Sequence, residues 1–68
     1  MIIILQRKDE DSETLIKLYT ERHYFSRSVT QHQTGKHRNS NSRIFDIDRF
    51  IAIRLKRGYR IIARLPDE

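Results

Sequence analysis

The chain has 68 residues, no cysteine and a formal net charge of +5, from 14 Lys and Arg against 9 Asp and Glu. We expect one small domain over residues 1–68, and the lack of cysteine excludes disulfides and thiolate metal sites. The positive charge favours a polyanionic partner, with nucleic acid first and an acidic protein surface second. No apolar run approaches the roughly 20 residues of a membrane span, so we expect a cytoplasmic protein without a membrane partner.

The chain opens with an apolar run from Met1 to Leu5, whose β-branched residues predict a strand. Both faces of this strand are apolar, which is typical of a strand that is covered on both sides. A chain this short needs a second layer from elsewhere, so we expect a homodimer. The terminal strands would pair with each other or across the dimer, through Ile2, Ile3, Ile4, Tyr59, Ile61, Ile62 and Ala63.

A first helix is predicted from Thr14 to Tyr24. The acidic run from Asp9 to Glu13 precedes it, and negative charge ahead of an apolar pattern is typical of a helix start. Apolar residues then recur at helical spacing and predict an amphipathic core helix. Its buried stripe would contain Leu15, Ile16, Leu18 and Tyr19.

A second helix is predicted from Ile47 to Arg57. Asp46 is a suitable N-cap, Phe45 and Phe50 are placed to form a hydrophobic staple, and Gly58 stands where the helix would stop. The expected buried stripe consists of Ile47, Phe50, Ile51 and Leu55.

The last element is a strand predicted from Tyr59 to Leu65, where apolar residues alternate with arginines until Pro66 ends the pattern. The expected fold class is therefore a small α+β domain. It would have an N-terminal strand, two to three helices and a C-terminal strand.

The segment from Ser26 to Arg43 is polar and basic, with Val29 as its one apolar residue, and it cannot build a core. The pattern predicts a short helix over residues 28–34, ended by Gly35, followed by a loop. The alternative is a flexible linker rich in Ser and Asn.

This basic segment is the predicted nucleic-acid-binding surface. Arg and Lys neutralise phosphates, while Ser, Thr and Gln hydrogen-bond to phosphates or base edges. Duplex DNA is the first expectation, but RNA stays open because Tyr19, Tyr24 and Phe25 could be core residues or a stacking platform. The candidate binding residues are Arg22, Ser26, Arg27, Ser28, Thr30, Gln31, Gln33, Lys36, His37, Arg38 and Arg43.

The segments Ser26–Thr30, Gly35-Lys36, Phe45–Ile51 and Gly58–Pro66 together resemble the second half of a lambda-repressor-like helix-turn-helix domain. The likeness extends over about two thirds of the chain and is greatest to the HigA-type antitoxins. It implies a DNA-binding dimer that represses its own promoter and, in antitoxins, binds a toxin. The recognition helix would then hold Ser26, Arg27, Ser28, Thr30, Gln31 and Gln33, and the phosphate-facing loop Lys36, Arg38 and Arg43.

Two other functions are alternatives. A small protein-binding inhibitor of the phage type would dock its basic surface on an acidic partner protein or host enzyme. A small ribonuclease would use Lys36, His37 and Arg38 as acid, base and charge stabiliser. We expect a regulator rather than an enzyme, with no cofactor. We expect no metal site either, because no Cys ligand lies near His23, His32 and His37 and their spacings match no known metal signature.

Overall fold

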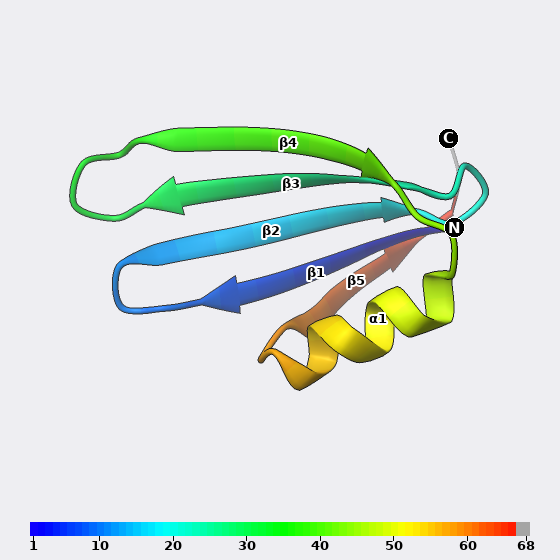
Figure 1. Cartoon of the computed structure of the whole chain (residues 1–68). Helices are drawn as coiled ribbons and strands as arrows, with labels where there is room; N and C mark the ends of the chain where they lie inside the picture. Colours follow the sequence, from blue (N-terminus) through cyan, green and yellow to red (C-terminus); the bar gives the residue numbers. More distant parts are fainter. Residues whose placement is uncertain (67–68) are drawn as a thin grey trace.

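The computed structural model describes residues 1–66 as a five-stranded antiparallel sheet with one helix (Figure 1). The strands lie in the order β4-β3-β2-β1-β5, so the first four form a meander and the helix carries the chain back to the far side of β1. The elements are β1 (Ile2–Lys8), β2 (Ser12–Tyr19), β3 (Tyr24–Gln31), β4 (His37–Arg43), α1 (Ile47–Lys56) and β5 (Arg60–Leu65).

The predicted fold class is wrong, because the chain is mostly antiparallel sheet and not an α+β domain with two to three helices. The predicted helix over Thr14–Tyr24 is β2 and the turn that follows it, and the predicted short helix over 28–34 is the end of β3 and its turn. The apolar spacing in this region fits two structures. It forms one stripe of a helix, but in a strand Ile16 and Leu18 point to one face while Leu15 and Tyr19 point to the other.

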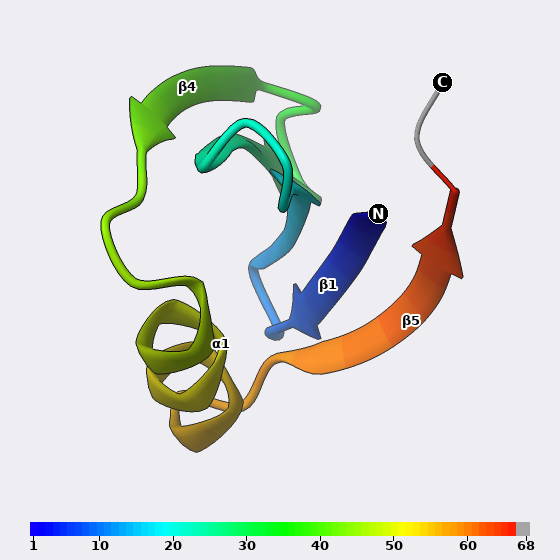
Figure 2. The same ribbon diagram turned by 90° about the vertical axis from the view of Figure 1, so that its right-hand side faces the viewer.

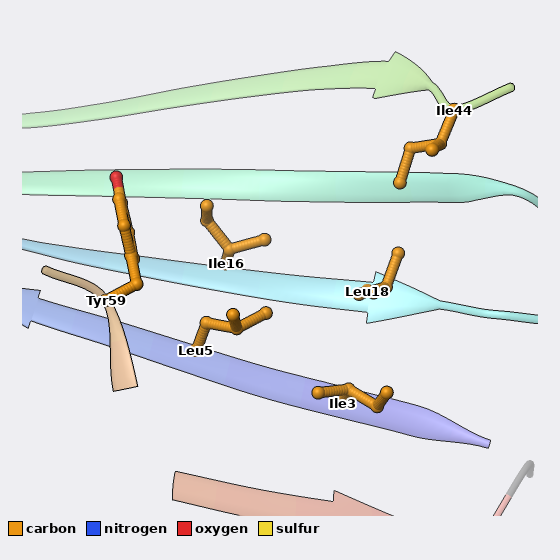
Figure 3. Packing of buried hydrophobic residues seen from close by; sticks show 6 residues of the cluster. All are labelled: Ile3, Leu5, Ile16, Leu18, Ile44 and Tyr59. Atoms are coloured by element: carbon orange, nitrogen blue, oxygen red, sulfur yellow. The ribbon is translucent and has the colours of Figure 1, made fainter. Parts of the chain in front are cut away.

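The sheet has one face covered by α1, which we call the helix face, and the opposite face, which we call the open face (Figure 2). Strand register places Ile3 opposite Leu18 and Leu5 opposite Ile16 on the helix face, where they form the centre of the core (Figure 3). The side chains that complete this core are Ile44 and Tyr59, with Phe25, Ile47, Phe50, Ile51 and Ile61 packed against them.

The predicted second helix is confirmed as α1, and its two ends are determined by local sequence. Asp46 caps the N-terminus, because its Oδ1 accepts a hydrogen bond of 3.0 Å from the Arg49 N–H. At the C-terminus, the N–H groups of Gly58 and Tyr59 donate to the carbonyls of Leu55 and Arg54 at 3.2 and 3.1 Å. This is the Schellman arrangement, and it requires the positive φ of +90° that Gly58 supplies.

Two details of the helix prediction are wrong. Phe45 is fully exposed and forms no staple, while the Phe50 ring packs instead on Phe25 of β3, with 4.8 Å between ring centroids. Leu55 is also largely exposed, whereas Arg54 is half-buried on the side of α1 that faces the sheet.

Replacing Asp46 with Ala is expected to lower the free energy of unfolding by about 1 kcal/mol, because the Arg49 N–H loses its hydrogen-bond acceptor. Urea denaturation followed by circular dichroism measures this loss. Asp48→Ala is the matched control, since it removes an exposed acid from the same first turn without removing the cap. An equal loss in both variants would show that charge at the helix end matters and the cap does not.

The terminal strands β1 and β5 pair with each other inside the chain, and β1 also pairs with β2. Both edges of β1 are therefore occupied, and a partner strand could be added only at β4 or β5. Of the residues expected at such a contact, Ile2, Ile3 and Tyr59 are buried, Ile4, Ile61 and Ala63 are half-buried, and Ile62 is exposed. No helix within residues 1–66 has the length and apolar character to cross a bilayer.

Candidate nucleic-acid interface

The basic segment forms the β3–β4 hairpin, which lies at one edge of the sheet (Figure 1). Its turn closes through hydrogen bonds of 2.9 Å from the Gln31 N–H to the Lys36 carbonyl and from the Gly35 N–H to the Gln31 carbonyl. Gly35 has a φ of +69°, which glycine adopts without strain. All seven residues of β4 are exposed, because this half of the sheet is not packed under a second layer.

The alternation of the strands divides the candidate binding residues between the two faces. Arg27, Gln31 and Arg38 lie on the helix face, next to Val29. Gln33 and Lys36 belong to the hairpin turn, and Arg22 to the turn between β2 and β3. The members on the open face are Ser26, Ser28, Thr30, His37 and Arg43.

A hollow of about 480 Å³ opens on the hairpin and contains three of the candidate cations. Arg27, Lys36 and Arg38 line it, with Val29 between them, and no acidic side chain takes part. Neutral hydrogen-bonding groups from Gln31, Asn39 and Ser40 complete the lining. We call this the basic hollow.

Arg54 adds a fourth cation on the helix face. Its guanidinium lies 4.5 Å from the centroid of the Phe50 ring, and that ring packs on Phe25, the residue that shares the helix face of β3 with Arg27. The Arg54 Nε is buried and has no hydrogen-bond partner among residues 1–66.

The charge environment of Arg54 is strongly positive. Burial lowers the pKa of its guanidinium; Tyr59 acts in the opposite direction, and the positive charges of Arg57, Arg27 and Arg7 lower the pKa further. These cations repel one another, and an anion placed among them would relieve that repulsion.

Arg7 differs from the other cations because partners within the chain hold it. Its guanidinium lies 4.8 Å from the centroid of the Tyr59 ring, and its Nη1 donates to the Arg57 carbonyl at 3.4 Å. Its Nε lies 3.5 Å from Oδ2 of Asp9. Arg27, Lys36, Arg38 and Arg54 form no ion pair with an acid of residues 1–66.

His37 lies on the open face, within hydrogen-bond distance of β3. Its Nδ1 is 3.1 Å from Thr30 Oγ1, and its Nε2 is 3.5 Å from Ser28 Oγ. Arg38 follows on the opposite face, and Lys36 precedes both in the turn. The three residues named for a ribonuclease therefore do not converge on one point.

The structure adds Arg54 to the site, a residue of the predicted second helix that was not among the candidate binding residues. A usable signal was present, because Arg54 follows Phe50 by four residues and so continues the apolar stripe of α1. A cation within such a stripe has to emerge beside the core.

Searches against protein-family models, curated proteins and solved structures each found no match for this chain. No cluster of three or more His, Cys, Asp or Glu side chains that could hold a metal occurs within residues 1–66. The interface has to be interpreted from its own geometry.

Proposed function

We propose that this protein binds nucleic acid through the phosphate backbone and acts as a small regulator of the repressor or antitoxin type. One observation carries the proposal. The basic hollow is lined by Arg27, Lys36 and Arg38 and by no acidic side chain, and the charge of Arg54 adds to theirs on the same face.

Phosphate is the ligand that best fits this chemistry. A guanidinium presents a planar fork of donors that matches two phosphate oxygens, and Lys36 supplies a mobile point charge beside it. Gln31, Asn39 and Ser40 can hydrogen-bond to sugar and phosphate oxygens without adding charge. Several cations along one hairpin suit a chain of phosphates better than a single anion.

A fluorescence-anisotropy titration at two salt concentrations tests the proposal, with labelled duplex DNA, single-stranded DNA and single-stranded RNA as probes. Three or four phosphate contacts predict a slope of log affinity against log salt of about −2 to −4, because each contact contributes roughly −0.7 on single strands and −0.9 on duplex. Absence of binding to all three probes at low salt would overturn the proposal.

A poly-glutamate peptide of similar length serves as the control for general attraction to negative charge. A nucleic-acid-binding protein should prefer the oligonucleotides at equal charge, because carboxylates on a peptide do not reproduce the spacing of phosphates. Equal or tighter binding of the peptide would favour an acidic protein as the partner.

A further inference from the structure

A second hollow, of about 610 Å³, lies at the other end of the hairpin from its turn. Its lining residues belong to the turn between β2 and β3, the adjoining ends of β3 and β4, and the segment between β4 and α1. Figure 1 shows these segments at the same end of the sheet. We call it the aromatic hollow, because it contains two aromatic rings together with cations. Its lining residues are Arg22, His23, Tyr24, Arg43, Ile44 and Phe45.

Phe45 is fully exposed although the backbone on both sides of it is fixed. Ile44 before it is buried, and the Ile44 N–H donates to the His23 carbonyl at 2.8 Å. Asp46 after it caps α1. The Phe45 ring is therefore presented to solvent by an anchored segment, and a large apolar ring in this position gains by packing against a ligand.

Tyr24 lies next to a second tyrosine and to cations. Its ring is 5.7 Å from that of Tyr19 between centroids, on the open face. The guanidinium of Arg22 lies 5.6 Å from the Tyr19 ring centroid, and Arg43 is the cross-strand neighbour of Tyr24. The nearby acid Glu21 is 3.8 Å from the N-terminal ammonium of Met1, which offsets its charge.

Aromatic rings combined with arginines suit a planar ligand that carries phosphate. A nucleobase can stack on Phe45 or Tyr24 while Arg22 and Arg43 hold the adjoining phosphates. Only an unpaired base offers a free face to such a ring, because a paired base is already stacked in its duplex.

The two hollows lie at opposite ends of the β3–β4 hairpin. Tyr24 and Val29 are five residues apart along β3, or roughly 17 Å at the rise of a strand, and their side chains lie on opposite faces of the sheet. That distance corresponds to about five nucleotides at a stacked spacing of roughly 3.4 Å. A single strand that occupies both hollows has to pass around the edge strand β4, with phosphates in the basic hollow and a base in the aromatic hollow.

We propose that the aromatic hollow takes an unpaired base, and that the nucleic acid bound by this protein is single-stranded. This inference rests on the proposed function and names its substrate class. It assigns stacking to Phe45 and Tyr24 and phosphate binding to Arg22 and Arg43.

The test compares Phe45→Ala with the unchanged protein, using labelled single-stranded RNA and DNA of about 12 nucleotides and a duplex of equal length. Phe45→Ala should lower the affinity for the single strands by about 5-fold to 150-fold and leave the duplex affinity and the salt slope unchanged. Leu55→Ala is the matched control, since Leu55 is another exposed apolar side chain, on α1 and outside both hollows, and it should change nothing.

Phe45→Trp gives a second readout, because the chain has no other tryptophan. Its ring should retain the single-strand affinity, and its fluorescence should be quenched when the oligonucleotide binds. Unchanged single-strand affinity in Phe45→Ala, or an equal loss on duplex, would overturn the inference.

The failure of this inference is distinguishable from failure of the proposed function. If no probe binds the unchanged protein, both are wrong. If the probes bind with the expected salt slope but Phe45→Ala binds them equally well, the phosphate contacts stand and the base site is wrong.

Discussion

Replacing both Arg27 and Arg38 with Gln is expected to reduce the affinity for nucleic acid by roughly 25-fold to 60-fold at about 0.1 M salt. Both side chains line the basic hollow, on neighbouring strands of the helix face. At this salt concentration each phosphate contact contributes about 5-fold on a single strand and about 8-fold on duplex through counterion release. Anisotropy titrations over a range of salt should also show a slope flattened by about 1.4 to 1.8.

The matched control is Arg49→Gln combined with Arg60→Gln. It removes the same two charges from exposed positions on α1 and β5, outside both hollows. This control should lose far less affinity, because screening weakens the effect of charges that do not contact the ligand. Equal losses in the two double variants would mean that binding depends on net charge and not on the basic hollow.

Stability gives a further check on the Arg27 and Arg38 variant. Arg27 is exposed, and its positive charge acts against the charged form of Arg54. Its replacement should therefore leave the thermal unfolding midpoint unchanged or raise it slightly. A large fall in the midpoint would mean that the variant loses binding because it unfolds.

Replacing Leu5 with Ala is expected to lower the free energy of unfolding by about 2 to 5 kcal/mol, because it opens a cavity in a close-packed core. Leu5 is 0% exposed, and it lies on the interior strand β1 opposite Ile16 of β2, which is also 0% exposed. A domain of this size is stable by only roughly 3 to 10 kcal/mol, so much of the variant should be unfolded at room temperature. Circular dichroism and urea denaturation measure the loss.

Two milder substitutions make the core prediction specific. Ile16→Val removes one methylene from the same layer and should cost about 0.5 to 1.5 kcal/mol. Leu55→Ala removes the same atoms as Leu5→Ala from a side chain that is 47% exposed, and it should cost clearly less. Similar losses for Leu5→Ala and Leu55→Ala would contradict the described core.

The cations of the helix face link stability to binding. Arg54 packs on Phe50 at the edge of the core, yet its Nε forms no hydrogen bond within residues 1–66 and its charged neighbours repel it. A phosphate bound nearby would relieve this repulsion, because its negative charge attracts Arg54 and Arg27 together. Phosphate-rich ligands should therefore raise the thermal unfolding midpoint of the unchanged protein.

Elements with strong local signals could be predicted from the sequence alone. Asp46 and Gly58 bracket α1 because a cap and a positive-φ stop act within a few residues of the chain. The β-branched run at the start and the alternation after Tyr59 likewise indicate β1 and β5. The absence of Asp and Glu between Arg22 and Phe45 identified the basic segment, because composition can be determined without knowing the fold.

Only the tertiary structure decided the rest. By spacing alone, a helix and a strand fit equally well to Leu15, Ile16, Leu18 and Tyr19. The strand forms because this segment pairs with β1 on one side and with β3 on the other. That pairing also determines register, which sends Arg27 to the helix face and Ser26 to the open face. The packing of Phe50 on Phe25 and the exposure of Phe45 depend on contacts between distant segments, and no local pattern in the sequence contains that information.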